Sequence, residues 1–457
     1  MQIAQDRLDK KYHDAVERWQ QRYFPDYPLL LHYWEKYFPR QQPFCLCSKL
    51  DLSTPEEIQV GRRAGEKKFT RAEQMEPEQA HRLLQIIKAQ ASTEFGSIQQ
   101  HQGSLDKAQD DEEKFFVLRV MAEELRHGYQ MFHLLTRDDW SQVSEQKGEE
   151  IVEEVLSMKT GSHVLGAFNI EYDSFVDNIV FAAVIDRVGK YQLTMQKVCA
   201  YKPMAASMPP MLQEEAFHLA AGVVPLRRWV RKAATGEITV PMAVIQRYLN
   251  KWVPRGYEMF GHEKGGQTNI ELGFKDMTNL QALRAYQAEL GRMVEDLNRN
   301  YVRARLPELG PEEARALVAS IQQHRERQRG IEPEELLRLP DERFFRRRGL
   351  WSHQMWSVDG EPFRDFEDYR RHLAAVLPEP YLAHRDFGEY LGAMRRLQAG
   401  EIDLKTAEAS APRLVRTSYC PCSKSVRWIV EEGQAAAGEP TAGGARCEPR
   451  ASCHGAA

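Results

Sequence analysis

A Glu-Glu-x-x-His sequence occurs twice in this chain, at residues 123–127 and at residues 214–218. Residues three apart in an α-helix lie on one face, so each copy can direct a carboxylate and an imidazole towards the same point. A further acidic residue precedes each copy by about 30 residues. If two such helix pairs are related by a pseudo-twofold axis, four carboxylates and two imidazoles meet. That set is the ligand pattern of a carboxylate-bridged dimetal centre in a four-helix bundle.

The candidate ligands fall where apolar residues recur at helical spacing, which predicts that they face a core. Buried acids are costly unless they are paired or bind a metal. A single Glu-x-x-His is often a surface pair, but two copies on apolar stripes, each with its upstream acid, favour a metal site. The candidates are Glu94, Glu124, His127, Asp186, Glu215 and His218.

The first acid of each pair leaves an alternative open. Glu123 and Glu214 lie four residues before the histidines, so geometry does not exclude them as ligands. They would point about 100° away from Glu124 and Glu215. Only one acid of each pair can therefore face the centre fully.

These residues resemble the phenylacetic-acid-catabolism family of ferritin-like di-iron oxygenases, and most closely the oxygenase components of its benzoyl-CoA epoxidases. The likeness runs from about residue 60 to residue 280, and an aspartate at position 186 matches this branch better than the general bundle pattern. The segments that carry it are Thr93-Glu94, 123–127, 185–193, 214–218, 246–250 and Phe260-Gly261.

The resemblance implies a mainly α fold, a ferritin-like four-helix bundle with added helices. In that family the second acid of each pair is a ligand, which favours Glu124 and Glu215. These two are then the catalytic candidates, able to bridge the metals or to shift between them. The resemblance implies two irons, and a carboxylate-rich site with one histidine per metal also suits manganese.

The resemblance also implies a monooxygenase that uses dioxygen to epoxidise or hydroxylate an aromatic acyl-CoA thioester such as benzoyl-CoA. Such enzymes take electrons from a separate reductase with flavin and iron–sulfur centres. This chain has no GxGxxG after a strand and no ferredoxin cysteine run, so we expect it to need that partner.

Two other function classes remain alternatives. A radical-generating or metal-oxidising protein, such as a nucleotide-reductase small subunit or a ferroxidase, would use the same ligands, and Tyr129 and Tyr191 are near enough in sequence to be radical sites. The family also contains subunits that have lost their ligands and serve as scaffolds. All six ligand positions are intact here, which argues against a scaffold.

The cysteines form a second constellation. Cys45-Leu46-Cys47-Ser48-Lys49 and Cys420-Pro421-Cys422-Ser423-Lys424 are near copies of one another. Four thiolates from Cys45, Cys47, Cys420 and Cys422 would make a tetrahedral structural zinc site that ties the two ends of the chain together. Free thiols, a redox-active pair and an iron–sulfur cluster are the alternatives, since the spacing is tighter than the usual Cys-x-x-Cys.

The pattern along the chain predicts four parts: an N-terminal helical segment (1–60), the dimetal bundle (61–305), a C-terminal helical and hairpin extension (306–431) and a disordered tail (432–457). Within them we expect one amphipathic helix in residues 1–40, and ligand helices at 77–102, 111–136, 167–201 and 207–234. Pro209-Pro210 indicates that the last of these starts or bends there, with Ser207 as its N-cap.

Two features of the C-terminal extension are predicted from local sequence. Val358-Asp359-Gly360 is a turn signal between strand-like pieces and predicts a small hairpin. The basic run at 343–349 has three interpretations: a solvated face, a site for the phosphates of a coenzyme A ester, or a nucleic-acid contact.

Composition narrows the function classes further. A net charge of −4 argues against nucleic acid as a partner. The longest apolar run, 179–185, is far too short to span a membrane, so no membrane partner is expected. Seven cysteines in a chain whose start is charged throughout indicate a reducing compartment, and we expect a cytoplasmic protein.

Overall fold

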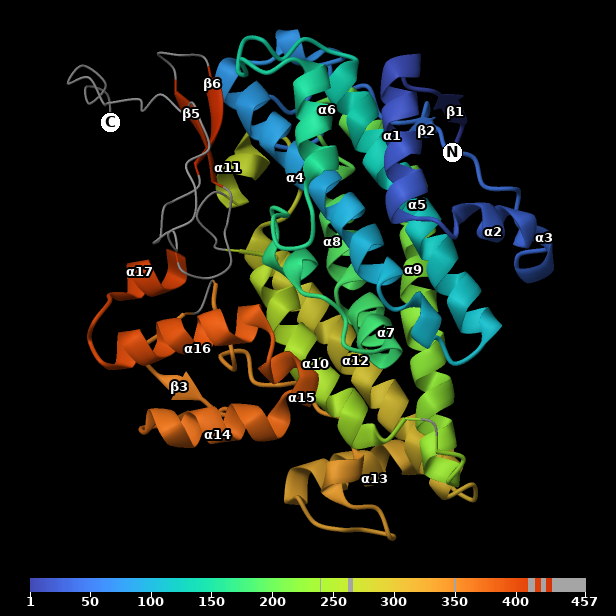
Figure 1. Cartoon of the computed structure of the whole chain (residues 1–457), viewed down its shortest axis with the longest axis vertical. Helices are drawn as coiled ribbons and strands as arrows, with labels where there is room; N and C mark the ends of the chain where they lie inside the picture. Colours follow the sequence, from blue (N-terminus) through green and yellow to red (C-terminus); the bar gives the residue numbers. More distant parts are fainter. Residues whose placement is uncertain (239, 262–265, 349–350, 410–415, 421–424, 430–457) are drawn as a thin grey trace.

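The computed structural model describes the chain except residues 239, 262–265, 349–350, 410–415, 421–424 and 430–457. The described chain is mainly α-helical and built around a helical bundle, which confirms the fold class expected from sequence (Figure 1). None of the described helices combines the length and apolar composition that crossing a bilayer requires.

Two helix pairs form the bundle. Helix α4 (Pro77–Gln102) packs against α5 (Asp111–Thr136). Helices α7 (Phe175–Val184) and α8 (Asp186–Gln196) both pack against α9 (Lys202–Thr235). Because α5 also packs against α9, the pairs are joined side by side, as Figure 1 shows.

Helices α4 and α5 have the bounds expected from sequence. A proline occupies the first turn of α4, where its missing N–H costs nothing. The Asp110 side chain caps α5 by accepting a hydrogen bond from the Glu113 backbone N–H at 2.8 Å, and three acids occupy the first turn. Local signals therefore suffice to define this pair.

The start of α9 was predicted wrongly. The helix begins at Lys202, passes without interruption through Pro209 and Pro210, and places Ser207 in its interior. Ser207 is not an N-cap, because its hydroxyl donates to the Pro203 carbonyl oxygen at 2.8 Å. Buried residues of this first part, Met204 among them, pack into the core and offset the proline penalty of about 3 kcal/mol.

The partner of α9 is shorter and divided. The expected helix at 167–201 is replaced by α7 and α8, which are separated at Ile185, directly before the candidate ligand Asp186. Helix α7 begins only at Phe175, because the Ser174 hydroxyl caps it by accepting from the Asp177 N–H at 3.2 Å.

The N-terminal segment is also not one helix. Strand β1 (Ile3–Asp6) pairs antiparallel with β2 (Ser48–Asp51), with Ile3 opposite Asp51 and Asp6 opposite Ser48. Short helices lie between them: α1 (Lys10–Tyr23), α2 (Tyr27–His32) and α3 (Trp34–Tyr37). Strand β2 packs on α5 and α9, so this segment lies directly over the ligand helices.

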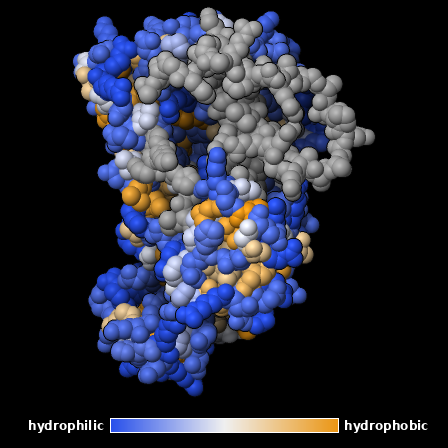
Figure 2. Space-filling model, turned by 90° about the vertical axis from the view of Figure 1, so that its left-hand side faces the viewer, coloured by the Kyte–Doolittle hydropathy of each residue, from blue (hydrophilic) through white to orange (hydrophobic). Residues whose placement is uncertain are grey.

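The remaining elements surround this core. The hairpin predicted near Asp359 is present as β3 (Met355–Trp356) and β4 (Pro362–Phe363). On the face that carries the C-terminal helices, apolar side chains gather midway along the molecule and hydrophilic ones lie below them (Figure 2). The other elements are α6 (Gly148–Ser157), α10 (Met242–Glu258), α11 (Gly266–Glu271), α12 (Asn279–Arg305), α13 (Pro311–His324), α14 (Phe366–Val376), α15 (Glu379–Leu382), α16 (Arg385–Gln398), α17 (Leu404–Ala409), β5 (Arg416–Cys420) and β6 (Ser425–Ile429).

The basic run at 343–349 is a solvated face only in part, because Arg343 is exposed whereas Arg346 and Arg347 are 4% and 2% exposed. The Arg347 guanidinium forms an ion pair with Asp386 of α16, and its backbone N–H donates to Glu258 Oε1 of α10 at 2.6 Å. These two arginines therefore join α10 to the C-terminal extension.

The close approach of α9 to α7 gives a stability prediction. An added Cβ at Gly222 would lie 2.4 Å from the backbone nitrogen of Ala183. We expect Gly222→Ala to lower the free energy of unfolding by about 2 kcal/mol in urea titrations, despite the better helix propensity of alanine. Gly291→Ala on α12 is the matched control, because its Cβ would meet nothing within 4 Å. Equal stabilities of the two variants would contradict the prediction.

Candidate metal centre

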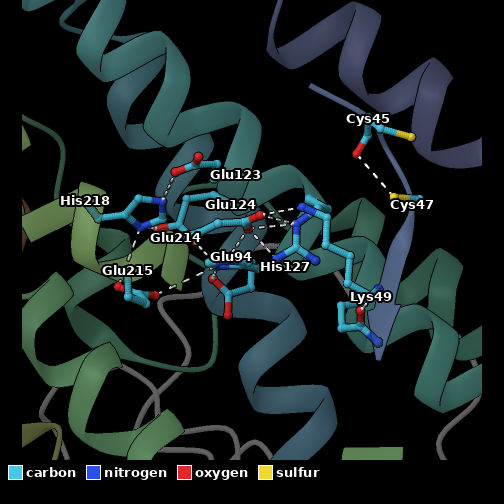
Figure 3. Close-up of polar contacts among 12 residues, drawn as sticks. Cys45, Cys47, Lys49, Glu94, Glu123, Glu124, His127, Glu214, Glu215 and His218 are labelled. Carbon is cyan, nitrogen blue, oxygen red and sulfur yellow. Dashed lines mark hydrogen bonds and ion pairs between the residues drawn. The ribbon is translucent and has the colours of Figure 1, made fainter. Parts of the chain in front are cut away.

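The six candidate ligands come from four helices: Glu94 from α4, Glu124 and His127 from α5, Asp186 from α8, and Glu215 and His218 from α9. All six are buried, with at most 8% of the residue exposed. Figure 3 shows five of them directed towards one another in the middle of the bundle. Five of the six predicted ligands therefore converge in space, and Asp186 lies outside both groups of close ligand atoms.

The donor atoms fall into two overlapping groups. One ligand atom each from Glu94, Glu124 and His127 lie within 4.8 Å of one another, as do atoms from Glu124, Glu215 and His218. Glu124 belongs to both groups. The arrangement could hold two neighbouring metal ions that share the Glu124 carboxylate.

Both imidazoles face the carboxylates through Nδ1. His127 Nδ1 lies 3.3 Å from Glu124 Oε2 and 3.8 Å from oxygens of both Glu94 and Glu215. His218 Nδ1 lies 3.6 Å from Glu215 Oε2 and 3.8 Å from Glu124 Oε1. The ring centroids are 5.4 Å apart.

Several donor atoms of the centre have no hydrogen-bond partner although they are buried: Glu124 Oε2, His127 Nδ1, Asp186 Oδ2, Glu215 Oε2 and His218 Nδ1. An unpaired buried polar atom normally costs about 1–3 kcal/mol. Cations coordinated by these atoms would remove that cost. Carboxylate oxygens with one imidazole nitrogen per metal suit iron or manganese, so the residues present fit such ions.

The pKa values of the ligand carboxyls also favour a cation at this site. Burial raises the pKa of Glu94 to about 7, and burial together with the neighbouring Glu94 carboxyl raises the pKa of Glu124 to about 8. Burial and the Glu124 charge raise the pKa of Asp186 well above its ordinary value. A bound divalent ion would reverse this effect and stabilise the ionised carboxylates.

Asp186 joins the group through α8. Its carboxyl interacts electrostatically with Glu124, Glu215 and both histidines. One turn further along α8, an added Cβ at Gly189 would lie only 3.4 Å from Glu215 Oε1. The face of α8 that carries Asp186 is therefore turned towards the Glu215 carboxylate.

The first acid of each pair takes a different position, and the two copies are crossed. Glu214 Oε2 lies 3.1 Å from Nε2 of His127, and Glu123 Oε2 lies 3.2 Å from Nε2 of His218. We call Glu123 and Glu214 the outer carboxylates, because they contact the imidazole nitrogens that face away from the centre. Such contacts fix the tautomer and orientation of a ligand histidine.

Cations that the sequence analysis did not identify hold the outer carboxylates. Arg119 Nε donates to Glu123 Oε1 at 2.9 Å, and the Arg119 guanidinium stacks 3.7 Å from the centroid of the Phe217 ring. Arg126 Nε donates to Glu214 Oε2 at 2.7 Å. Arg119 lies four residues before Glu123, a spacing that could have indicated its role from sequence, whereas Arg126 lies 88 residues before Glu214.

Tyr172 is a further residue that sequence reasoning missed. It is buried, and its hydroxyl has no hydrogen-bond partner. Burial and the nearby Asp186, Asp177 and Glu124 carboxyls raise its pKa well above the ordinary value. By contrast, the two tyrosines predicted as radical sites are engaged elsewhere: the Tyr129 hydroxyl accepts from the Leu8 N–H at 2.8 Å, and the Tyr191 hydroxyl donates to Glu289 at 2.8 Å.

The zinc prediction falls partly outside the described residues. Cys422 and the side chain of Cys420 are not described. Cys45 and Cys47 are free thiols, and Cys47 Sγ contacts the Cys45 carbonyl oxygen at 3.6 Å (Figure 3). Burial raises the pKa of Cys47 to about 11. A site built from all four cysteines stays a prediction.

Comparisons with known proteins give one informative similarity. No family model matches the chain. Over 225 residues it is 28% identical to "Benzoyl-CoA oxygenase component B" of Aromatoleum evansii. The match covers 44% of this chain and 46% of that protein, so it spans about half the length of the curated relative.

Proposed function

We propose that this chain is the oxygenase component of a di-iron monooxygenase that epoxidises or hydroxylates an aromatic acyl-CoA thioester, with benzoyl-CoA as the first candidate. The observation that carries the proposal is the pair of overlapping Glu/His groups sharing Glu124, with buried donor atoms that lack partners. The similarity to a benzoyl-CoA oxygenase component supports the choice of substrate. That relative is named as one component of several, which supports a separate reductase.

Each of the two iron positions would be held by its own set of residues. Glu94, Glu124 and His127 would hold one iron, and Asp186, Glu215 and His218 would hold the other with Glu124 shared. Two ferrous ions bound there would supply the electrons and open positions needed to reduce dioxygen. The Glu214 carboxylate would keep His127 Nε2 protonated, so the Nδ1 lone pair of that ring would point at the metals.

The surroundings protect this chemistry. The side chains of His127 and His218 are fully buried, which keeps bulk water away from reactive species. The Tyr172 hydroxyl has no hydrogen-bond partner among the described residues, and the Asp186, Asp177 and Glu124 charges help to raise its pKa. It is a candidate for keeping a proton near the centre.

The proposal is tested by loading the protein anaerobically with ferrous iron and supplying benzoyl-CoA, a chemical reductant with a mediator, and ¹⁸O₂. Each turnover consumes one dioxygen, two electrons and two protons, and gives one water and one oxygenated thioester. We expect two irons per chain and a product that contains one ¹⁸O atom. Two bound irons without any label in benzoyl-CoA or other aryl-CoA esters would overturn the proposal.

The same experiment separates the radical and metal-oxidising alternatives. The spectrum after oxygen exposure would show a tyrosyl radical in the first case, and oxygen-dependent iron oxidation without substrate turnover in the second. A radical that disappears in Tyr172→Phe would identify its site, because the Tyr172 hydroxyl is buried without a hydrogen-bond partner and its pKa responds to the ligand charges.

A further inference from the structure

The two outer carboxylates carry unequal positive charge. Glu214 is held by Arg126 and also accepts a hydrogen bond from Lys49 Nζ at 2.9 Å (Figure 3). Glu123 has one cationic partner among the described residues besides the histidine, which is Arg119. The charge beside His127 is therefore more positive by one unit than the charge beside His218.

Backbone and side-chain hydrogen bonds fix the position of Lys49. It lies on β2, and its backbone N–H donates to Gln130 Oε1 of α5 at 2.6 Å. Gln130 Nε2 in turn donates to the Ser207 hydroxyl of α9 at 3.0 Å. The N-terminal strand is thus fixed to both helices that carry the Glu-x-x-His motifs, and its lysine reaches in between them.

An additional cation at this position weakens metal binding by electrostatic repulsion. It repels a divalent ion bound by His127 directly. Nothing comparable acts on His218 among the described residues, because the second cation is missing from Glu123.

We propose that Lys49 makes the two metal positions unequal, so that the position of His218 fills first and the position of His127 fills second and more weakly. Lys49 is a positioning residue for the charge of the site and does not touch a metal. The inference rests on the proposed dimetal centre.

The test measures metal affinity rather than turnover. Wild-type protein and Lys49→Met are titrated with Co²⁺ by calorimetry, and the exchangeable Nε2–H signals of the two histidines are followed by paramagnetic proton NMR. We expect the weaker binding step to tighten by about tenfold in Lys49→Met while the tighter step is unchanged, for one charge partly screened by water. One of the two Nε2–H signals should shift.

Lys202→Met is the matched control. Lys202 has 27% of its side chain exposed and pairs with Glu56, whereas Lys49 has 26% exposed and pairs with Glu214. Lys49→Arg keeps the charge and should keep the wild-type affinities. The inference would be overturned if Lys49→Met changed the affinities of both binding steps equally, or changed neither. It would also be overturned if Lys202→Met showed the same change in affinity, or if Lys49→Arg behaved like Lys49→Met. Wild-type protein that binds no metal would instead overturn the proposed function beneath it.

Discussion

Glu124→Ala is expected to bind neither metal ion, to lose all oxygenase activity and to remain folded. Glu124 is the one residue common to both ligand groups, and its two oxygens face both histidines at 3.3 and 3.8 Å. Removing it takes a ligand from each metal at once and leaves two cations with no bridging charge between them. We expect the affinity for ferrous iron to fall by at least about a thousandfold, as ligand loss exceeds the 10–100-fold cost of losing an outer contact. Anaerobic iron binding measured by elemental analysis gives the stoichiometry directly.

Two variants of the same helix serve as controls. Glu113 is 1% exposed and accepts a hydrogen bond from Trp229 Nε1 at 3.1 Å. It lies about three helical turns before Glu124, so Glu113→Gln should keep two irons. Glu123→Gln removes an outer carboxylate charge next to Glu124 and should weaken binding by about 10–100-fold without abolishing it. If Glu123→Gln loses the metals while Glu124→Ala retains them, the roles of the two acids are reversed.

The ligand helices could be predicted where local signals and tertiary packing agree. Helix α4 begins with a proline and α5 with an aspartate cap, and their apolar stripes match the faces that they bury. The start of α9 could not be predicted, because Pro209 and Pro210 are strong local signals against a helix interior. Packing of the preceding turn outweighs them, and no local pattern reports that packing.

The residues that contact the ligands could not be predicted from sequence for a different reason. The outer carboxylates contact histidines of the opposite motif, so their role depends on how α5 and α9 are placed side by side. Lys49 reaches Glu214 from 165 residues away along the chain. Spacing within one helix identifies residues that share a face. These contacts join different helices and strands, and the sequence pattern does not predict how those elements pack against one another.

Metal-free protein is expected to lose stability as pH rises from about 6.5 to about 8. Below pH 6.5 the loss is opposed by the buried His81, His101 and His163, because burial lowers the pKa of each to about 4. The pKa of Glu94 rises from 4.5 in the unfolded chain to about 7 in the folded one, and that of Glu124 rises to about 8. The folded protein then binds more protons than the unfolded chain across this window, so the free energy of unfolding decreases with pH. The stabilisation is complete below pH 4.5 and is lost as pH passes the folded values. Glu94 alone accounts for about 3 kcal/mol.

Urea unfolding of the metal-free protein at pH 6.5, 7 and 8 measures this slope. Glu94→Gln, which cannot ionise, should flatten it, and the raised pKa of His218 acts in the same direction as that of Glu94. Saturating ferrous iron under anaerobic conditions should make stability rise with pH instead. The metal replaces the protons on the ligand carboxyls, so it binds more tightly as those carboxyls ionise. A metal-free protein that gains stability between pH 6.5 and 8 would mean that its carboxylates are already ionised and paired when folded. The centre would then be a preformed ion-pair network, and a metal would have no orphaned charge to satisfy.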